Sequence, residues 1–104
     1  MNELRLVYKI LKIIERSLDY EEFDNDPISA ETLKVSVPRW SFIIKMLVDK
    51  GYIAGVKVQN LNHQDYPCIQ IQRPSVTLDG LEYLNDNKMM KKISNAAKGI
   101  AEIF

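Results

Sequence analysis

Several residue types on which common active sites depend are scarce in this chain. Cys68 is the single cysteine and His63 the single histidine, so neither a disulfide within the chain nor a cysteine-based metal cluster can form. The four glycines occur one at a time, without the spacing of a dinucleotide-binding or phosphate-binding loop. A lone histidine in a polar run is more typical of a solvated side chain than of a catalytic base. We therefore predict no catalytic residues, no metal site and no cofactor.

Long apolar runs are also missing. No segment approaches the roughly 20 apolar residues that a membrane span needs, and the first residues begin an amphipathic pattern rather than a secretion signal. The chain is therefore expected to be cytoplasmic and not associated with a membrane. Its 104 residues suit one domain, which we divide into a core and wing over residues 1–87 and a terminal helix over residues 88–104.

The net charge is zero, yet the charges are segregated along the chain. Residues 19–32 carry six acids and no base, while residues 33–73 carry six bases and two acids. The acidic residues lack the spacing and the central glycine of an EF-hand calcium loop. The acidic segment would repel phosphate, and the basic segment has the charge that a nucleic-acid interface requires.

Apolar spacing predicts three helices in the first half of the chain. Apolar residues at helical spacing predict an amphipathic helix over residues 2–18. They are Leu4, Val7, Leu11, Ile14 and Leu18, with Tyr8 and Ile10 beside them. Residues 19–27 should form a loop, and the proline at 27 argues against helix at Asp26. Ser29 should cap a short helix over residues 30–35. Ser36 should cap a third helix that ends at Gly51 and buries Trp40, Ile43, Ile44, Leu47 and Val48.

The second half predicts a β-hairpin between helices. Two segments with alternating apolar and polar residues flank a polar loop over residues 60–67. Their apolar residues are Ile53, Val56 and Val58 in the first segment and Cys68, Ile69 and Ile71 in the second. Thr77 or Ser75 can cap the next helix, in which Leu78, Leu81 and Leu84 should pack inward. A final amphipathic helix is expected from Met89 to Phe104.

This order of elements predicts an α+β winged helix-turn-helix, with a three-helix core, a two-stranded wing and additional C-terminal helices. The step from Leu47 through Gly51-Tyr52-Ile53 into a wing resembles MarR- and PadR-type winged helices. A closer resemblance, over Leu4 to Ile100, is to the YjcQ-like family of bacteria and their prophages. The matching segments are residues 6–12, residues 51–56, and the Thr77, Gly80 and Tyr83-Leu84 positions. The resemblance implies a winged-helix fold and a phage-related setting, and it carries no established activity.

The functional hypothesis is that the third helix and the wing bind double-stranded DNA, as a transcriptional regulator does. An outward Arg39 can pair with guanine, and Phe42 can contact a thymine methyl group. The predicted DNA-binding residues are Arg39, Ser41, Phe42, Lys45, Lys57, Gln59, Asn62, His63 and Arg73. We expect Arg39, Lys45, Lys57 and Arg73 to form one basic surface.

Two alternatives stay open. Phe42 and Met46 on an outward face also suit a winged helix that binds a protein partner and no DNA. The apolar stripe from Met89 to Phe104 can pair two chains into a homodimer, or it can pack on the first helix of its own chain.

Overall fold

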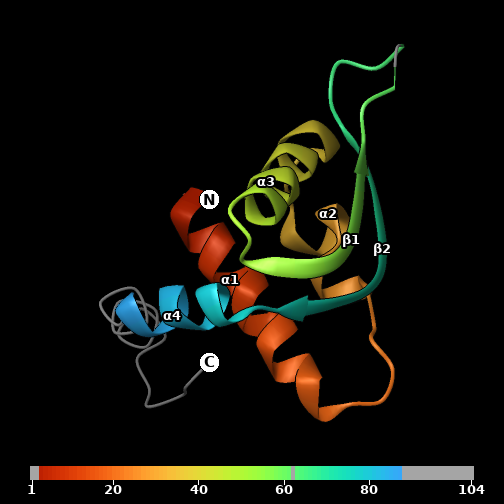
Figure 1. The fold of residues 1–104 in the computed structure, drawn as a ribbon. Coiled ribbons are helices and arrows are strands. Elements are labelled where there is room, and N and C mark those ends of the chain that lie inside the picture. Colours follow the sequence, from red (N-terminus) through yellow and green to blue (C-terminus); the bar gives the residue numbers. More distant parts are fainter. Residues whose placement is uncertain (1–2, 62, 88–104) are drawn as a thin grey trace.

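The structure is a computed structural model, and it describes residues 3–61 and 63–87. Its main elements follow the order of a winged helix (Figure 1): α1 (Glu3–Arg16), α2 (Ala30–Leu33), α3 (Val37–Asp49), β1 (Ile53–Gln59), β2 (Cys68–Val76) and α4 (Leu78–Asp86). Two short 3₁₀ turns, η1 (Ser17–Asp19) and η2 (Asp26–Ile28), lie between α1 and α2. The predicted fold class is confirmed. The predicted helix over 89–104 lies outside the described residues.

The core forms around α1, but the buried stripe of this helix differs from the predicted one. Ile10 and Ile14 are fully buried, with Leu6 and Leu11 beside them. Leu4 and Leu18 are 59% and 52% exposed, so their predicted burial is wrong for the part of the chain that is described. The reason is geometric. Leu4 lies at the edge of the stripe in the first turn, and Leu18 falls in η1, after the helical period has ended.

Side-chain caps fix where the next helices begin, as predicted. The Ser29 hydroxyl accepts a hydrogen bond from the Thr32 N–H at the start of α2, and the Ser36 hydroxyl accepts one from the Arg39 N–H at the start of α3. α2 ends at Leu33, two residues earlier than expected, because Lys34 takes a left-handed conformation with φ +60°. Gly51, at φ +74°, follows α3 as predicted.

The segment before α2 is less irregular than predicted. Asp26 starts the η2 turn, which the Ser29 N–H closes by donating to the Asp26 carbonyl. The prediction that Asp26 is not helical is therefore wrong. The clash of a proline ring with the preceding residue disfavours the helical conformation without forbidding it, and here the helical conformation lasts for a single 3₁₀ turn.

The antiparallel hairpin joins the two predicted strands, with Val56 opposite Ile71 and Val58 opposite Ile69. β2 extends further than predicted, and Ile53 lies opposite Val76. Nearer the base of the hairpin the register shifts. Ala54 pairs with Ser75, so Gly55 alone lies opposite residues 72–74 of β2. Gly55 has φ +81°, which a side chain would strain, and Pro74 is buried at this bulge. The bulge bends β2 toward α1, which it contacts.

α4 begins at the Thr77 cap, which accepts from the Gly80 N–H and so decides between the two predicted caps. Gly80 is buried against Tyr52, and the rings of Tyr52 and Tyr83 lie 5.1 Å apart between centroids. Burial raises the pKa of the Tyr83 hydroxyl, and neighbouring Tyr52 raises it further. Leu78 is 78% exposed and Leu81 is 38% exposed, so the predicted inward packing of these two residues is wrong in the described part of the chain, whereas Leu84 packs against the core.

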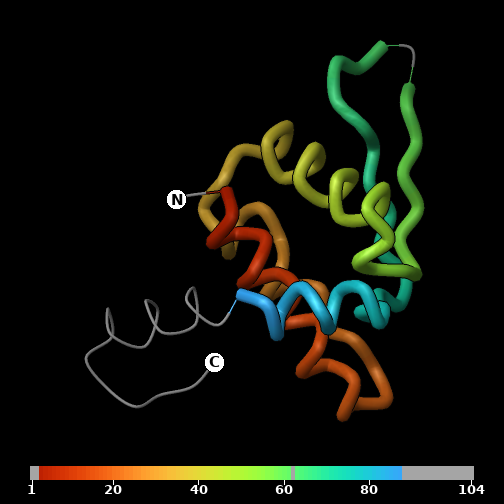
Figure 2. The backbone as a smooth tube through the Cα atoms, turned by 60° about the vertical axis from the view of Figure 1, so that its left-hand side comes forward, coloured from red at the N-terminus to blue at the C-terminus, as the bar shows by residue number. Residues whose placement is uncertain are grey.

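The hairpin and the acidic residues of the chain lie at opposite ends of the fold. The hairpin projects beyond α3 at one end of the molecule, and the segment between α1 and α2 forms the opposite end (Figures 1 and 2). That opposite end holds residues 19–26, which carry five of the six acids of residues 19–32 and are called the acidic segment from here on. The segregation of charge along the sequence is therefore also a segregation in space.

Candidate nucleic-acid interface

The outer face of α3 is the first part of the candidate interface. Ile43, Ile44 and Leu47 anchor the inner face of the helix in the core. The Trp40 indole N–H also points inward and donates to the Ile28 carbonyl over 2.7 Å. On the opposite side, Phe42 is 47% exposed, as the helical spacing predicts for an outward position. The face is thus available to a partner along the length of the helix.

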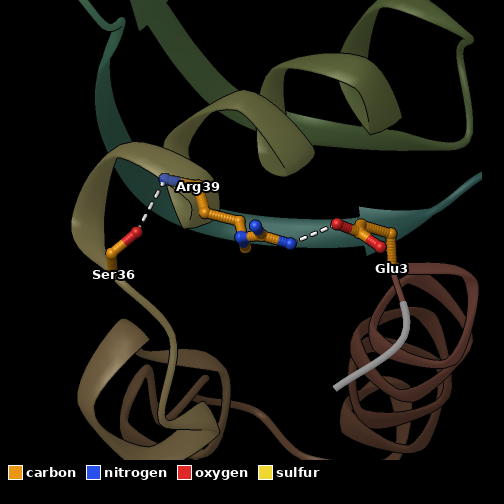
Figure 3. A network of polar contacts seen from close by, with 3 residues as sticks. All are labelled: Glu3, Ser36 and Arg39. Carbon is orange, nitrogen blue, oxygen red and sulfur yellow. Dashed lines mark hydrogen bonds and ion pairs between the residues drawn. The ribbon is translucent and has the colours of Figure 1, made fainter.

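Arg39 lies on this face, and its charge is paired with an acidic side chain. Its guanidinium forms an ion pair with Glu3 at the start of α1, while its backbone N–H is held by Ser36 (Figure 3). The Arg39 side chain is 52% exposed and the Glu3 side chain 57% exposed. An ion pair this exposed is worth only about 0–1 kcal/mol, so a phosphate can replace the carboxylate at little cost.

Lys45, six residues further along α3, is also paired. Its ammonium lies 2.6 Å from the Asp49 carboxylate, four residues on. Asp49 therefore cancels the charge of Lys45 locally, as Glu3 cancels that of Arg39. The net positive charge of the α3 face is smaller than the number of its basic residues suggests.

Ser41 does not belong to the outer face. Its side chain is 2% exposed, so the prediction that it contacts DNA from the outer face is wrong. Ser41 precedes Ile44 by three residues and Val48 by seven, which places it on the same side of the helix as these two. A serine is small enough to be buried there.

Arg73 is also directed elsewhere. Its guanidinium donates to the Ser17 carbonyl over 3.0 Å and to the Tyr20 carbonyl over 2.7 Å, and it lies 5.7 Å from the centre of the Phe23 ring. The bulge beside Gly55 bends β2 so that Arg73 reaches the end of α1. The expectation that Arg73 shares a surface with Arg39 is wrong.

The hairpin is the second part of the predicted interface. Lys57 and Gln59 are exposed and alternate with the half-buried Val56 and Val58. On the other face, Ile69 and Ile71 border a cavity of about 220 Å³ together with Trp40 of α3. Since α3 lies on that side, Lys57 and Gln59 occupy the hairpin face turned away from it. The four predicted basic residues therefore do not form one continuous surface.

The remaining predicted positions lie in the hairpin loop. His63 is exposed there, and Asn62 is outside the described residues. The prediction missed Lys34, an exposed lysine at the turn between α2 and α3. Its position two residues before the Ser36 cap could have indicated that it lies beside the start of α3.

Over residues 3–61 and 63–87, no group of three histidine, cysteine, aspartate or glutamate residues could hold a metal ion. Within the same ranges, no helix is long and apolar enough to cross a membrane.

Three helices, a projecting antiparallel hairpin and a further helix define the class of winged-helix-like proteins. The chain belongs to the YjcQ family, because the family model described as YjcQ protein matches residues 8–103. No curated protein and no solved structure matches the chain.

Proposed function

We propose that this YjcQ-family protein binds double-stranded DNA through the outer face of α3 and the β1–β2 hairpin, as a transcriptional regulator does. The observation that carries the proposal is the separation of these elements from the acidic segment, which lies at the opposite end of the molecule (Figure 2). DNA that approached the acidic end would be repelled, and DNA that approached α3 would meet Lys34, Arg39 and Lys45.

The geometry of α3 is compatible with this role. The major groove of B-DNA admits one α-helix. α3 is 13 residues long and has an exposed outer face beside the hairpin. Arg39 lies in the first turn, the part of a recognition helix that usually reaches base edges. Two or three phosphate contacts are available, so binding to generic DNA should be weak and sensitive to salt.

The proposal is tested by comparing two matched lysines. Lys45→Ala and Lys12→Ala each remove one charge and one helical ion pair, with Asp49 and Glu15 respectively. Lys12 lies on α1, outside the proposed interface. In a fluorescence anisotropy titration of a duplex, Lys45→Ala should weaken binding about three- to tenfold and lower the salt slope by about one unit, as loss of one phosphate contact does.

Lys12→Ala should leave DNA affinity within twofold of the wild type. Asp49→Asn provides the converse test, because removal of the carboxylate releases Lys45 and should strengthen binding. Equal effects of the two lysine variants would contradict a DNA-binding role for α3.

A second candidate function is protein binding through the same helix. Val37, Phe42 and Met46 are each about half exposed, at 51%, 47% and 51%, which is unusual for large apolar side chains on a surface that contacts only water. This role predicts no salt-dependent affinity for generic duplex DNA. It also predicts that binding of a protein partner is lost in Phe42→Ser and kept in Lys45→Ala.

We further propose that two chains pair through the predicted helix over residues 89–104. A homodimer would offset the small charge of each interface by contacting two half-sites of the DNA. Sedimentation equilibrium should then show a mass above the 12.0 kDa of one chain, and Ile93→Glu should give a folded monomer. A concentration-independent monomer of the wild type at high micromolar protein would contradict the dimer.

A further inference from the structure

A cavity of about 430 Å³ is lined by residues of the end of α1 and of the segment that follows it. This segment lies at the end of the molecule away from α3 (Figure 1). Ile13, Phe23 and Pro27 form apolar walls of the cavity, and Tyr20 lies at its edge with 68% of its surface exposed. The volume lies within the range of small-molecule sites, about 300–1,000 Å³. Nothing in the proposed DNA interface uses this cavity.

The charged groups around the cavity favour a positively charged ligand. Glu22 and Asp24 both border it, and the Asp24 carboxylate is held in place because it accepts the Asp26 N–H over 3.0 Å. Arg16 is the one base among the described residues that line it. Three further acids of the same segment, Asp19, Glu21 and Asp26, add to the negative potential.

The walls of the cavity already stabilise one organic cation. The Arg73 guanidinium is bound by the carbonyl groups of Ser17 and Tyr20 and lies over the Phe23 ring. Backbone carbonyls and an aromatic face are the groups that attract a delocalised cation. Arg73 itself takes up the Ser17 and Tyr20 carbonyl groups, but the Tyr20 side chain also borders the cavity and offers a second aromatic ring to a cation.

We propose that this cavity binds a hydrophobic organic cation. The apolar part of the ligand packs between Ile13, Phe23 and Pro27, and its charge lies toward Glu22 and Asp24 beside the Tyr20 ring. Because Arg73 belongs to β2 and contacts the same walls, ligand binding also changes the environment of the hairpin base. The site does not depend on whether α3 binds DNA.

The test compares two probes of equal shape and opposite charge, tetraphenylphosphonium and tetraphenylborate, on the ¹⁵N-labelled full chain. We expect the cation to bind at least tenfold more tightly than the anion. It should shift the amide resonances of Ser17, Tyr20 and Phe23, together with the Arg73 side-chain N–H. Equal affinities, or no shifts at the cavity amides, would overturn the site. Shifts that leave Arg73 unchanged would overturn the link to the hairpin.

Three variants locate the ligand. Glu22→Gln removes a carboxylate that borders the cavity, whereas Glu31→Gln makes the same change on α2, away from it. Glu22→Gln should weaken binding of the cation about fivefold, in line with a partly exposed charge pair, and Glu31→Gln should change it less than twofold. Tyr20→Ala keeps the backbone carbonyl that Arg73 needs and should also cost about fivefold.

The Glu22 and Tyr20 side chains are exposed, so these variants should fold normally, which a thermal melt verifies. Equal affinities of the Glu22→Gln and Glu31→Gln variants for tetraphenylphosphonium would show that the cation does not occupy this cavity.

Discussion

Gly55 provides the strictest test of the hairpin geometry. It has φ +81°, and it is the single residue of β1 opposite the β2 bulge. A Cβ atom at this position would overlap the Arg73 carbonyl oxygen and would lie 2.9 Å from the Arg73 carbonyl carbon and 3.2 Å from the Pro74 Cα. All three atoms belong to the backbone, so no side-chain rotation can relieve the overlap. Gly55→Ala must therefore displace one strand of the hairpin.

Gly51 offers a matched control for this substitution. Its φ of +74° is nearly the same, but the nearest atom to an added Cβ is the Asp79 carboxylate oxygen at 4.0 Å. Gly51→Ala should therefore cost only the left-handed strain, about 1–2 kcal/mol. Gly55→Ala should cost this strain and also the cost of overpacking, about 1–3 kcal/mol, which together give about 2–5 kcal/mol.

Urea unfolding followed by circular dichroism measures both variants against the wild type. We expect the free energy of unfolding to fall at least about 1 kcal/mol further in Gly55→Ala than in Gly51→Ala. Equal losses in the two variants would refute the close approach of β1 to the Arg73 carbonyl, and with it the bulge that directs Arg73 toward α1.

Two further predictions concern aromatic side chains. Trp40→Phe keeps a large ring but removes the indole N–H that donates to the Ile28 carbonyl over 2.7 Å. In a thermal melt it should lower stability by about 1–2 kcal/mol, because one hydrogen bond is lost. Trp40→Ala also removes the packing of the ring and should cost about 3–5 kcal/mol. Similar losses in the two variants would show that the ring does not pack as described. The pKa of Tyr83 is raised above 10.0 in the folded protein, so its stabilising contribution is complete below pH 10 and is lost as the pH rises through the folded value. Urea midpoints between pH 8 and 11 should therefore fall less steeply in Tyr83→Phe than in the wild type, and identical slopes would contradict the raised pKa.

Features that depend on neighbouring residues could be predicted from the sequence. Ser29, Ser36 and Thr77 each cap a helix through an N–H three residues ahead, so the signal and its partner lie within one turn. The pairing of Val56 with Ile71 follows from the alternation of each strand. Local chemistry was therefore enough to predict the winged-helix order of elements.

Features that depend on packing between distant segments could not be predicted. Arg73 lies in a strand pattern that suggests exposure, and only the bulge opposite Gly55 turns it toward Ser17, 56 residues earlier. The Arg39 ion pair joins residues 36 apart, which no helical spacing reveals. The burial of Ser41 could have been predicted, because its spacing from Ile44 already places it on the inner side of α3.

The proposed role of α3 and the hairpin is tested most directly by the affinity of the wild-type chain for a generic DNA duplex. Fluorescence anisotropy measures this affinity at salt concentrations from about 25 to about 200 mM, because phosphate contacts make DNA binding strongly dependent on salt in this range. Two or three phosphate contacts predict that log K falls against log salt with a slope of about −2 to −3. A slope near zero, or no binding at the lowest salt, would contradict DNA binding and would favour a protein partner for the exposed face of α3.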